Sequence, residues 1–480
     1  MLCIPSDVNY FIPQLNFFIW NYVLIYGLFG IGLFFTFKLK FIQFIYFPEM
    51  FRAVRGKSSD PEGISPFQAL AISLASRVGT GNLTGVAVAL YLGGPGTVFW
   101  MWMVALLGMA TAYAESTLAQ LYKIRGADGR YRGGPAFYIS RGLNAPIAAT
   151  IFSICLIINF GLIFNAVQAN SIAEVMQGAL GVPKLNTGVF VAALCSLVIF
   201  GGLGYIARVV QVVMPAMSLA YLSLAIFIIA TNFALVPDLL RDIVSSAFGL
   251  REAAGGVAGS MAAAMLNGVK RGFFSNEAGM GSAPNIAAVA TPDPHHPTSQ
   301  GLVQALGVFI DTILICTATA IMILLSGVLE PGSGVNGAQL TQHALTAHLG
   351  PTGTYFVAVA IFCFAFASLL GNYTYAENAM NYLGASSRFS VTSLRFFVLG
   401  TVVWGACADV ETVFSVADIT MGLMGALNLT AVFLLADPVI RVTHDYFHQR
   451  KLGRAPEFHL SRFPEIQGKV DANIWSPQRV

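Results

Sequence analysis

Charged residues are scarce in this chain of 480 residues. Asp, Glu, Lys and Arg make up only 10% of it, whereas a soluble globular domain carries about 25%. The 26 basic and 23 acidic residues leave a formal charge of only +3. No basic patch is interleaved with aromatic residues, which excludes a nucleic-acid-binding protein. Hydrophobic residues make up 56% of the chain, which excludes a disordered one.

Cysteine and histidine are also few. The six cysteines lie far apart and form no CxxC pair, which argues against a disulfide framework or a zinc site and predicts small buried hydrophobic side chains. They are Cys3, Cys155, Cys195, Cys316, Cys363 and Cys407. All seven histidines fall in predicted loops or the C-terminal tail, which argues against an imidazole proton relay within a membrane. No HExxH, GxSxG or phosphate-loop motif is present, so we expect no enzymatic activity.

Long apolar runs dominate what is present. The mean hydropathy is +0.70, and the 48 glycines favour closely packed membrane helices. About 20 apolar residues suffice to cross a bilayer. Runs of that length fall at 16–37, 67–92, 96–122, 146–180, 186–205, 206–234, 256–290, 300–328, 352–383, 394–409 and 412–437. The sequence therefore predicts an all-α polytopic membrane protein with eleven spans, the first of them a retained helix rather than a signal peptide.

The basic residues predict the orientation of these spans. With the N-terminus outside, 20 of the 26 fall in inside segments or in the C-terminal tail. Three fall outside and three within spans: Lys184, Arg241 and Arg251, then Arg77, Lys270 and Arg271. Because inside loops carry an excess of Lys and Arg, this sorting supports eleven spans with the N-terminus outside and the C-terminus inside.

Two of the predicted spans contain polar, glycine-rich interruptions. They include Arg77-Val-Gly79-Thr80-Gly81-Asn82 in the second span and Gly272-Phe-Phe-Ser-Asn276-Glu277-Ala-Gly279-Met-Gly281 in the seventh. Non-helical backbone is tolerated in a bilayer only where protein or a cavity satisfies it, and it can then bind a cation or a carboxylate. With the first span set aside, each interruption opens a group of five spans, and the two groups run in opposite senses. This pattern indicates a transporter rather than a channel.

Longer motifs around these residues resemble those of the alanine or glycine:cation symporter family. They are Arg77-Val-Gly-Thr-Gly-Asn-Leu-Thr-Gly-Val-Ala-Val, Gly93-Gly-Pro-Gly-Thr-Val-Phe-Trp-Met-Trp, Glu115-Ser-Thr-Leu-Ala-Gln-Leu-Tyr, Arg132-Gly-Gly-Pro-Ala-Phe-Tyr, Phe274-Ser-Asn-Glu-Ala-Gly-Met-Gly-Ser-Ala-Pro-Asn and Tyr373-Thr-Tyr-Ala-Glu-Asn. The resemblance covers roughly residues 20–450. It implies a leucine-transporter-type 5+5 inverted repeat with one extra N-terminal helix. It also implies sodium-coupled import of alanine and glycine across a bacterial inner membrane.

On this basis the chain divides into four parts, and the resemblance assigns roles to individual residues. The parts are an N-terminal helix with a cytoplasmic linker (1–66), two five-helix repeats (67–234 and 235–440) and a cytoplasmic tail (441–480). The implied substrate-binding residues are Gly79, Thr80, Gly81, Asn82, Gln168, Gly272, Phe273, Asn276, Ser368 and Asn372. The implied sodium ligands are the carbonyls of Ala75, Val78 and Ala365 and the hydroxyl of Ser368, all oxygens as a hard cation prefers. A second ion is expected beside Asn82, and neither another cofactor nor an obligatory protein partner is implied.

Charges at membrane depth are the candidates for gating or coupling. Glu277 can gate the site, form an ion pair with Arg77 or couple to an ion or a proton, whereas Lys270 and Arg271 form an outer gate or a fixed salt bridge. Four other acidic residues are expected to be helix-packing partners: Glu115, Asp311, Glu377 and Asp418. Some relatives carry Trp where this chain has Asn372, which leaves glutamine or a D-amino acid open as the substrate. Proton coupling remains an alternative to sodium coupling.

Overall fold

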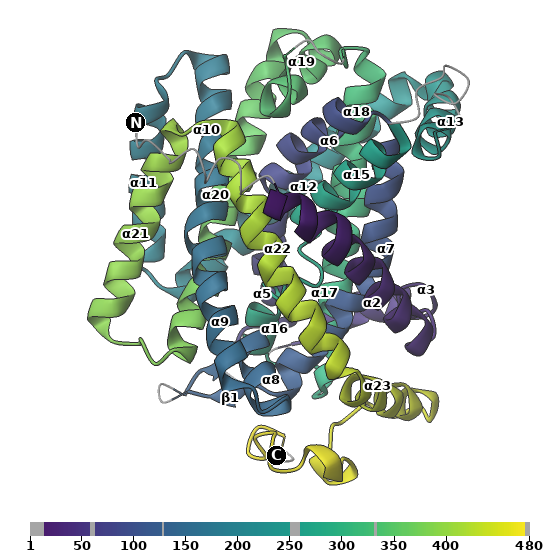
Figure 1. The fold of residues 1–480 in the computed structure, drawn as a ribbon, viewed down its shortest axis with the longest axis vertical. Coiled ribbons are helices and arrows are strands. Elements are labelled where there is room, and N and C mark those ends of the chain that lie inside the picture. Colours follow the sequence, from purple (N-terminus) through teal and green to yellow (C-terminus); the bar gives the residue numbers. More distant parts are fainter. Residues whose placement is uncertain (1–13, 58–62, 127–128, 250–259, 331–333, 476–480) are drawn as a thin grey trace.

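The computed structural model describes residues 14–57, 63–126, 129–249, 260–330 and 334–475, and this part is almost entirely helical (Figure 1). Eight of its helices are long and apolar enough to cross a membrane. They are Gln14–Lys38, Gly96–Leu121, Pro146–Leu180, Leu203–Thr231, Pro297–Ser326, Pro351–Tyr382, Arg388–Cys407 and Val413–Leu434. Of the three other predicted spans, the fifth is a shorter apolar helix, Lys184–Ile199, and the second and seventh are interrupted.

The N-terminal half begins with one long helix and continues with a larger group. The helix comprises η1 (Ile19–Leu24) and α2 (Ile25–Lys38), where η marks π- or 3-10-helical segments, and α3 (Ile42–Ile45) and α4 (Phe47–Val54) follow it. The group consists of α5 (Pro66–Arg77), η2 (Gly81–Gly85), α6 (Val86–Gly93), α7 (Gly96–Leu121), β1 (Ile124–Arg125), β2 (Tyr131–Arg132), α8 (Pro135–Gly142), α9 (Pro146–Leu156), η3 (Ile157–Ile163), α10 (Phe164–Leu180), α11 (Lys184–Ile199), α12 (Leu203–Thr231), η4 (Phe233–Leu235) and α13 (Val236–Ala247).

The C-terminal half repeats the motif of an interrupted helix followed by long ones. Its elements are α15 (Ser260–Asn276), α16 (Pro284–Val289), α17 (Pro297–Val308), η5 (Phe309–Cys316), α18 (Thr317–Ser326), α19 (Gly337–Leu349), α20 (Pro351–Tyr382), α21 (Arg388–Cys407), α22 (Val410–Leu434), α23 (Ala436–Lys451), η6 (Leu460–Arg462) and η7 (Pro464–Ile466). One set of packed helices, α10 with α11, α20 and α21, lies on the left of Figure 1. A second set, α7 with α2, α15 and α17, lies on the right.

Both interruptions predicted from the sequence are present. The first falls between α5, which ends at Arg77, and η2; the second falls between α15 and α16. In the second, Glu277, Gly279 and Gly281 have φ angles of +55°, +90° and +83°. Only glycine adopts such left-handed conformations at little cost, so the glycines at two of these positions make the turn possible.

Several expectations need correction. The expected all-α class holds, with one small addition, the two-residue strands β1 and β2, which pair antiparallel. The fifth and sixth spans meet near Gly201 rather than at residue 205, and the predicted loop 329–351 contains α19. Cys407 is exposed because apolar side chains in a membrane protein also face lipid. Of the other cysteines, Cys195 and Cys316 are buried, Cys155 and Cys363 are half-buried, and Cys3, like Arg251, lies outside the described residues.

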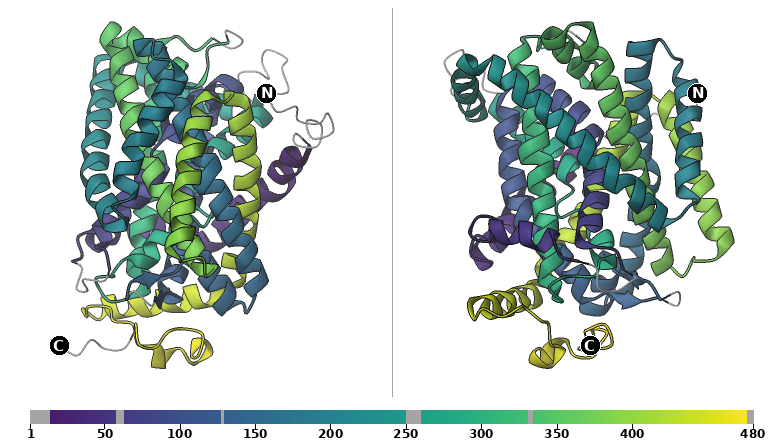
Figure 2. Two further views of the ribbon diagram at one scale, coloured as in Figure 1. Left: turned by 90° about the vertical axis from the view of Figure 1, so that its left-hand side faces the viewer. Right: turned by 180° about the vertical axis from the view of Figure 1, so that it is seen from behind.

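The C-terminal segment packs against one end of the helices rather than extending away from it. Figure 2 shows α23 and the chain after it beneath the other helix ends. The ring of Trp475 lies 5.0 Å from that of His295, and Nζ of Lys469 donates to the carbonyl oxygen of Gly142 at 3.0 Å. The segment from Lys469 to Trp475 is therefore held on the same face as α8.

His296 links this segment to the start of α17. Burial lowers the pKa of His296, so its ring is neutral at neutral pH. Its Nδ1 accepts the N–H of Thr298 at 3.3 Å and so caps α17, which assigns the ring proton to Nε2. Nε2 then donates to Oδ2 of Asp445 at 3.4 Å.

Close packing of small residues joins the helices of the first set, as it commonly does in membranes. A Cβ atom at Gly405 of α21 would lie 2.4 Å from Cα of Ala166 in α10, whereas one at Gly400 of the same helix would meet nothing within 4 Å. The close contact between α10 and α21 therefore requires glycine at position 405.

Gly405→Ala is therefore expected to destabilise the protein by about 1–3 kcal/mol, because backbone cannot yield as a flexible side chain can. Gly400→Ala is the matched control, since both substitutions raise helix propensity equally. Thermal unfolding of the purified proteins in one detergent measures the difference. Equal midpoints for the two variants would contradict this account of the interface.

Candidate functional site

The first helix break lies between α5 and η2, and two buried side chains satisfy its free N–H groups. The N–H of Gly79 donates to Oδ1 of Asn82 at 3.0 Å. The N–H of Thr80 donates to Oε1 of Gln168 on α10 at 3.1 Å. All four residues are buried. The structure thus brings together four of the residues expected to bind substrate.

Gly79 and Gly81 are points of close approach. A Cβ atom at Gly79 would lie 2.4 Å from Oγ of Ser368 and 2.7 Å from Oε1 of Gln168. At Gly81 it would lie 3.1 Å from the ring of Phe274. These two positions leave the backbone open to contact from α10, α15 and α20, which a side chain would block.

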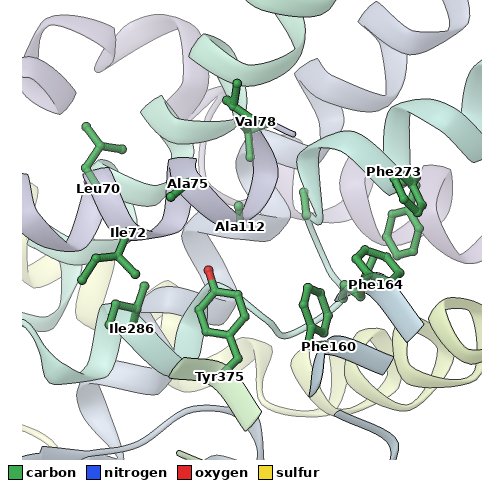
Figure 3. Packing of buried hydrophobic residues seen from close by; sticks show 14 of the residues in the cluster. Leu70, Ile72, Ala75, Val78, Ala112, Phe160, Phe164, Phe273, Ile286 and Tyr375 are labelled. Atoms are coloured by element: carbon green, nitrogen blue, oxygen red, sulfur yellow. The ribbon is translucent and has the colours of Figure 1, made fainter. Parts of the chain in front are cut away.

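Ser368 connects α20 to the end of α5. Its hydroxyl donates to the carbonyl oxygen of Ala75 at 2.7 Å and lies 3.5 Å from that of Val78. Figure 3 shows Ala75 and Val78 on the last turn of α5 and at the break. Ala365 is buried one turn earlier on α20. The Ser368 hydroxyl therefore lies within hydrogen-bonding distance of two of the three other expected sodium ligands.

A polar cluster that the sequence did not predict surrounds the side chain of Asn82. Its Nδ2 donates to Oδ1 of Asp311 at 2.7 Å. Oδ2 of Asp311 accepts from the hydroxyls of Ser275 at 2.8 Å and Thr312 at 2.7 Å. Asp311 was expected to be a helix-packing partner, and the available signal was a carboxylate inside an apolar run. Its contact with Asn82 depends on the packing of η5 against η2, which the sequence does not reveal.

A second polar network runs from α5 to α10 and α20. Oγ of Ser76 lies 3.0 Å from Oε1 of Glu277 and 2.6 Å from Oδ1 of Asn372. Nδ2 of Asn372 donates to Oδ1 of Asn165 at 3.1 Å. Asn372 and Ser368 are four residues apart on α20, so both face the first break.

Glu115 of α7 organises the second break. Its Oε1 accepts the N–H of Gly279 at 3.2 Å, and its Oε2 accepts the N–H of Gly281 at 3.2 Å and Nδ2 of Asn428 at 2.7 Å. Glu115 and Asn428 are fully buried. A side chain expected to be a packing partner therefore satisfies the free backbone of the interrupted helix.

Arg77 is buried but does not pair with Glu277. Its Nη1 donates to the carbonyl oxygen of Gln304 at 3.3 Å, and within the described residues its Nε and Nη2 have no hydrogen-bond partner. Glu277 accepts instead from the hydroxyls of Ser76 and Ser282. Of the alternatives left open for Glu277, the ion pair with Arg77 is absent from this structure.

Lys270 and Arg271 form ion pairs with Asp418 of α22. Nη1 and Nη2 of Arg271 each lie 3.3 Å from a carboxylate oxygen of Asp418, and Nζ of Lys270 lies 3.7 Å from it. Nζ of Lys270 also lies 5.2 Å from the ring of Trp20 in η1. Both cations therefore pair with one buried carboxylate, an arrangement that fits the outer gate as well as the fixed salt bridge.

The three expected residues from α15 do not all face the first break. The ring of Phe273 lies 6.0 Å from that of Trp20, on the side of η1. Its neighbour Phe274 lies against Gly81 instead and stacks on Phe164 at 4.7 Å. Successive residues on a helix point about 100° apart, so the aromatic residue at the break is Phe274.

Gly272 and Asn276 also make contacts within the protein. A Cβ atom at Gly272 would lie 3.3 Å from Cα of Met101 in α7, so this residue allows two helices to pack. Oδ1 of Asn276 accepts the N–H of Ala278 at 3.0 Å, while within the described residues its Nδ2 has no partner. Asn276 thus supports the second break and retains one free donor.

The chemistry of the first break suits a small zwitterion and a cation. Two N–H groups point at acceptors that a ligand carboxylate can replace, because the amide of Gln168 can both donate and accept. Carbonyl and hydroxyl oxygens at Ala75, Val78 and Ser368 form a neutral oxygen-lined position. A carboxylate at Asp311 adds a negative charge on the other side of Asn82.

A family model described as the sodium:alanine symporter family matches residues 6–460 of this chain. The chain is 45% identical over 479 residues to the "Amino-acid carrier protein AlsT" of Bacillus subtilis, covering 100% of this chain and 98% of that protein. It is 43% identical over 446 residues to the "Probable sodium/glutamine symporter GlnT" of the same organism, covering 92% of each.

The fold is similar to that of a solved transporter of low sequence identity. A crystal structure of a manganese transporter mutant from Eremococcus coleocola superimposes with a TM-score of 0.51 at 14% identity, covering 82% of each chain. At this identity the likeness extends to the fold alone.

The network around Glu115 predicts a stability effect. In Glu115→Gln a single side-chain oxygen remains for three donors, so one N–H of the second break faces an NH2 group. We expect a loss of about 1–3 kcal/mol of unfolding free energy. Ser116→Ala is the control, because within the described residues the Ser116 hydroxyl has no partner. Thermal unfolding in detergent measures both, and an unchanged midpoint for Glu115→Gln would show that the network contributes nothing.

Proposed function

This chain belongs to the sodium:alanine symporter family, and from that premise we propose that it imports small neutral amino acids, chiefly alanine and glycine, together with sodium. The observation that carries the proposal is the break at Gly79 and Thr80. There, oxygens of buried side chains accept hydrogen bonds from the two free N–H groups, beside a position lined by carbonyl and hydroxyl oxygens. A multi-pass membrane protein with such a break has the parts that a coupled transporter needs.

The amino-acid carboxylate binds at the first break. It accepts from the N–H groups of Gly79 and Thr80, replacing Oδ1 of Asn82 and Oε1 of Gln168 as their acceptors. The released oxygen of Gln168 then accepts from the substrate ammonium. Because Phe274 closes the space beside Gly81, the site favours a small side chain.

Sodium binds between the end of α5 and α20. The carbonyls of Ala75, Val78 and Ala365 and the hydroxyl of Ser368 supply its ligands, and the Ser368 hydroxyl turns its proton away from Ala75 when the ion enters. All of these ligands are oxygens, which a hard cation prefers. An ion at this position fixes the last turn of α5 and so orders the neighbouring carboxylate site.

A second cation binds beside Asn82. Asp311 supplies the charge, and the hydroxyls of Ser275 and Thr312 already lie on its carboxylate. The desolvation of a buried carboxylate is costly unless a cation or a proton balances it. If a proton replaces sodium as the coupling ion, it would bind to Asp311 or to the buried Glu277.

Transport proceeds by rocking of one group of helices against the other around the two breaks. We assign the chain eleven spans, two inverted groups of five and one additional N-terminal helix, with the N-terminus outside and the C-terminus inside. The sorting of basic residues supports this orientation, and the bacterial relatives support placement in a bacterial inner (plasma) membrane.

Glutamine is the second candidate substrate. Asn372, Asn165 and Ser76 form a polar wall one helical turn from Ser368, and amide groups there can pair with the amide of a longer side chain. A relative that carries the name of a glutamine symporter is 43% identical to this chain.

Labelled alanine is expected to enter proteoliposomes when sodium is higher outside than inside, and to stop entering when choline replaces sodium. Asn82→Ala and Gln168→Ala remove the acceptors at the break, so uptake should fall at least about 100-fold, or about 2.7 kcal/mol. Uptake of glutamine alone would assign the chain to the second substrate. Uptake that persists in choline and falls with a protonophore would overturn sodium coupling.

Gly79→Ala should impair transport with little effect on folding. The new methyl group displaces Ser368 and Gln168, both of which can rotate away, so the thermal midpoint changes little while kcat/KM falls at least about tenfold. Gly85→Ala is the matched control, since its Cβ would meet no atom nearer than 3.7 Å. Equal transport by the two variants would remove Gly79 from the site.

A further inference from the structure

A polar funnel opens at the end of the molecule that carries β1, β2 and α8. Its outer part is a pocket of about 630 Å³ lined by Arg130, Arg132, Arg141, Glu377 and Asn381, among others. Its inner part is a smaller cavity of about 60 Å³ that shares four of these residues and ends at α16 and Tyr375. The outer pocket is large enough for an amino acid, whereas the inner cavity holds little more than water.

Tyr375 separates this funnel from the first helix break. Its ring lies between Ile286 and Phe160, and its hydroxyl points toward α5 near Ala75 (Figure 3). The hydroxyl lies near Ser76, but it forms no hydrogen bond of good geometry with any of the described residues. An unpaired buried hydroxyl is costly, so Tyr375 is placed where a passing polar ligand would satisfy it.

Hydrogen bonds of Asn378, called the Asn378 clasp below, hold together the wall of the inner cavity next to Tyr375. Nδ2 of Asn378 donates to the carbonyl oxygen of Gly133 at 2.7 Å and to Oδ1 of Asn285 at 2.7 Å. These bonds tie α20 both to the segment between β2 and α8 and to α16, which follows the second break. Movement at the second break would therefore pull directly on the wall of the funnel.

The charges of the outer pocket match a zwitterion. Arg130 and Arg132 each already interact within the protein. The further donors of their guanidinium groups can hold a carboxylate, because arginine presents five donors, paired in the geometry that a carboxylate accepts. Glu377, which is half-buried and has the phenol of Tyr373 beside it, can hold an ammonium group. Within the described residues Glu377 forms no ion pair within 4 Å, so its charge remains available to a ligand.

We propose that this funnel holds a second, transient binding site for the transported amino acid, with its carboxylate on Arg130 and Arg132 and its ammonium on Glu377. The inference rests on the proposed function. Tyr375 and the Asn378 clasp form the barrier between this site and the break. Their opening lets the amino acid pass from one site to the other, so release takes place in two steps.

Cysteine protection tests this site separately from the break. Asn381→Cys places a thiol in the funnel, and Gln168→Ala in the same chain disables the first site. A site with a dissociation constant of about 1 mM is about 90% occupied at ~10 mM alanine, so a cationic thiol reagent should react about tenfold more slowly. Propionate, which lacks the ammonium group, should protect less, and Glu377→Gln should abolish protection by alanine.

Two controls make the result decisive. Ser387→Cys places an exposed thiol outside the funnel, and the chain without an added cysteine gives the background from its own thiols. The site would be overturned if alanine failed to slow the reaction of Cys at position 381, or slowed the reaction at position 387 equally. Sodium-driven uptake of alanine by the unaltered chain would in that case still support the proposed function. Loss of uptake by the unaltered chain would overturn the proposed function, and this site with it.

Discussion

Every helix that stops inside a membrane leaves N–H and C=O groups that no water can satisfy, and this requirement organises the centre of the molecule. At the first break, Asn82 and Gln168 accept the N–H groups of Gly79 and Thr80. At the second, Glu115 accepts two N–H groups with Asn428 beside it. The two solutions differ in kind. Glu115 is a fixed acceptor, whereas Asn82 and Gln168 are amides that can exchange partners with a ligand.

On the basis of this difference we propose separate roles for the two breaks. The groups that hold the first break together can also pair with a carboxylate and an ammonium group, so in the proposed binding mode the ligand costs the protein few hydrogen bonds. The second break is tied to α7 and, through Asn285 and Asn378, to the wall of the funnel. A change at the first site can therefore reach the opposite end through packed and hydrogen-bonded elements, as coupling between sites requires.

The sequence predicted those features that depend on local residue type. The breaks were predictable because glycine and asparagine interrupt apolar runs, and eight of the expected spans have long apolar helices. The contacts of Gln168, Ser368 and Asn372 with the first break came only from family resemblance, since residues on separate spans meet only after packing. Glu115 and Asp311 were visible as charges, but their partners lie 164 and 229 residues away. Phe273 and Phe274 are adjacent and of the same residue type. Which of the two rings faces the first break depends on the rotation of α15 about its axis, and helix packing sets that rotation.

We propose that sodium beside Ser368 orders the first break and thereby creates the carboxylate site. The most direct measurement is the equilibrium affinity of the purified protein for labelled alanine, with sodium and with choline at equal ionic strength. Alanine is expected to bind about 5–150-fold more tightly in sodium, a coupling of about 1–3 kcal/mol, and the difference should be smaller in Ser368→Ala. Equal affinity in the two salts would contradict it.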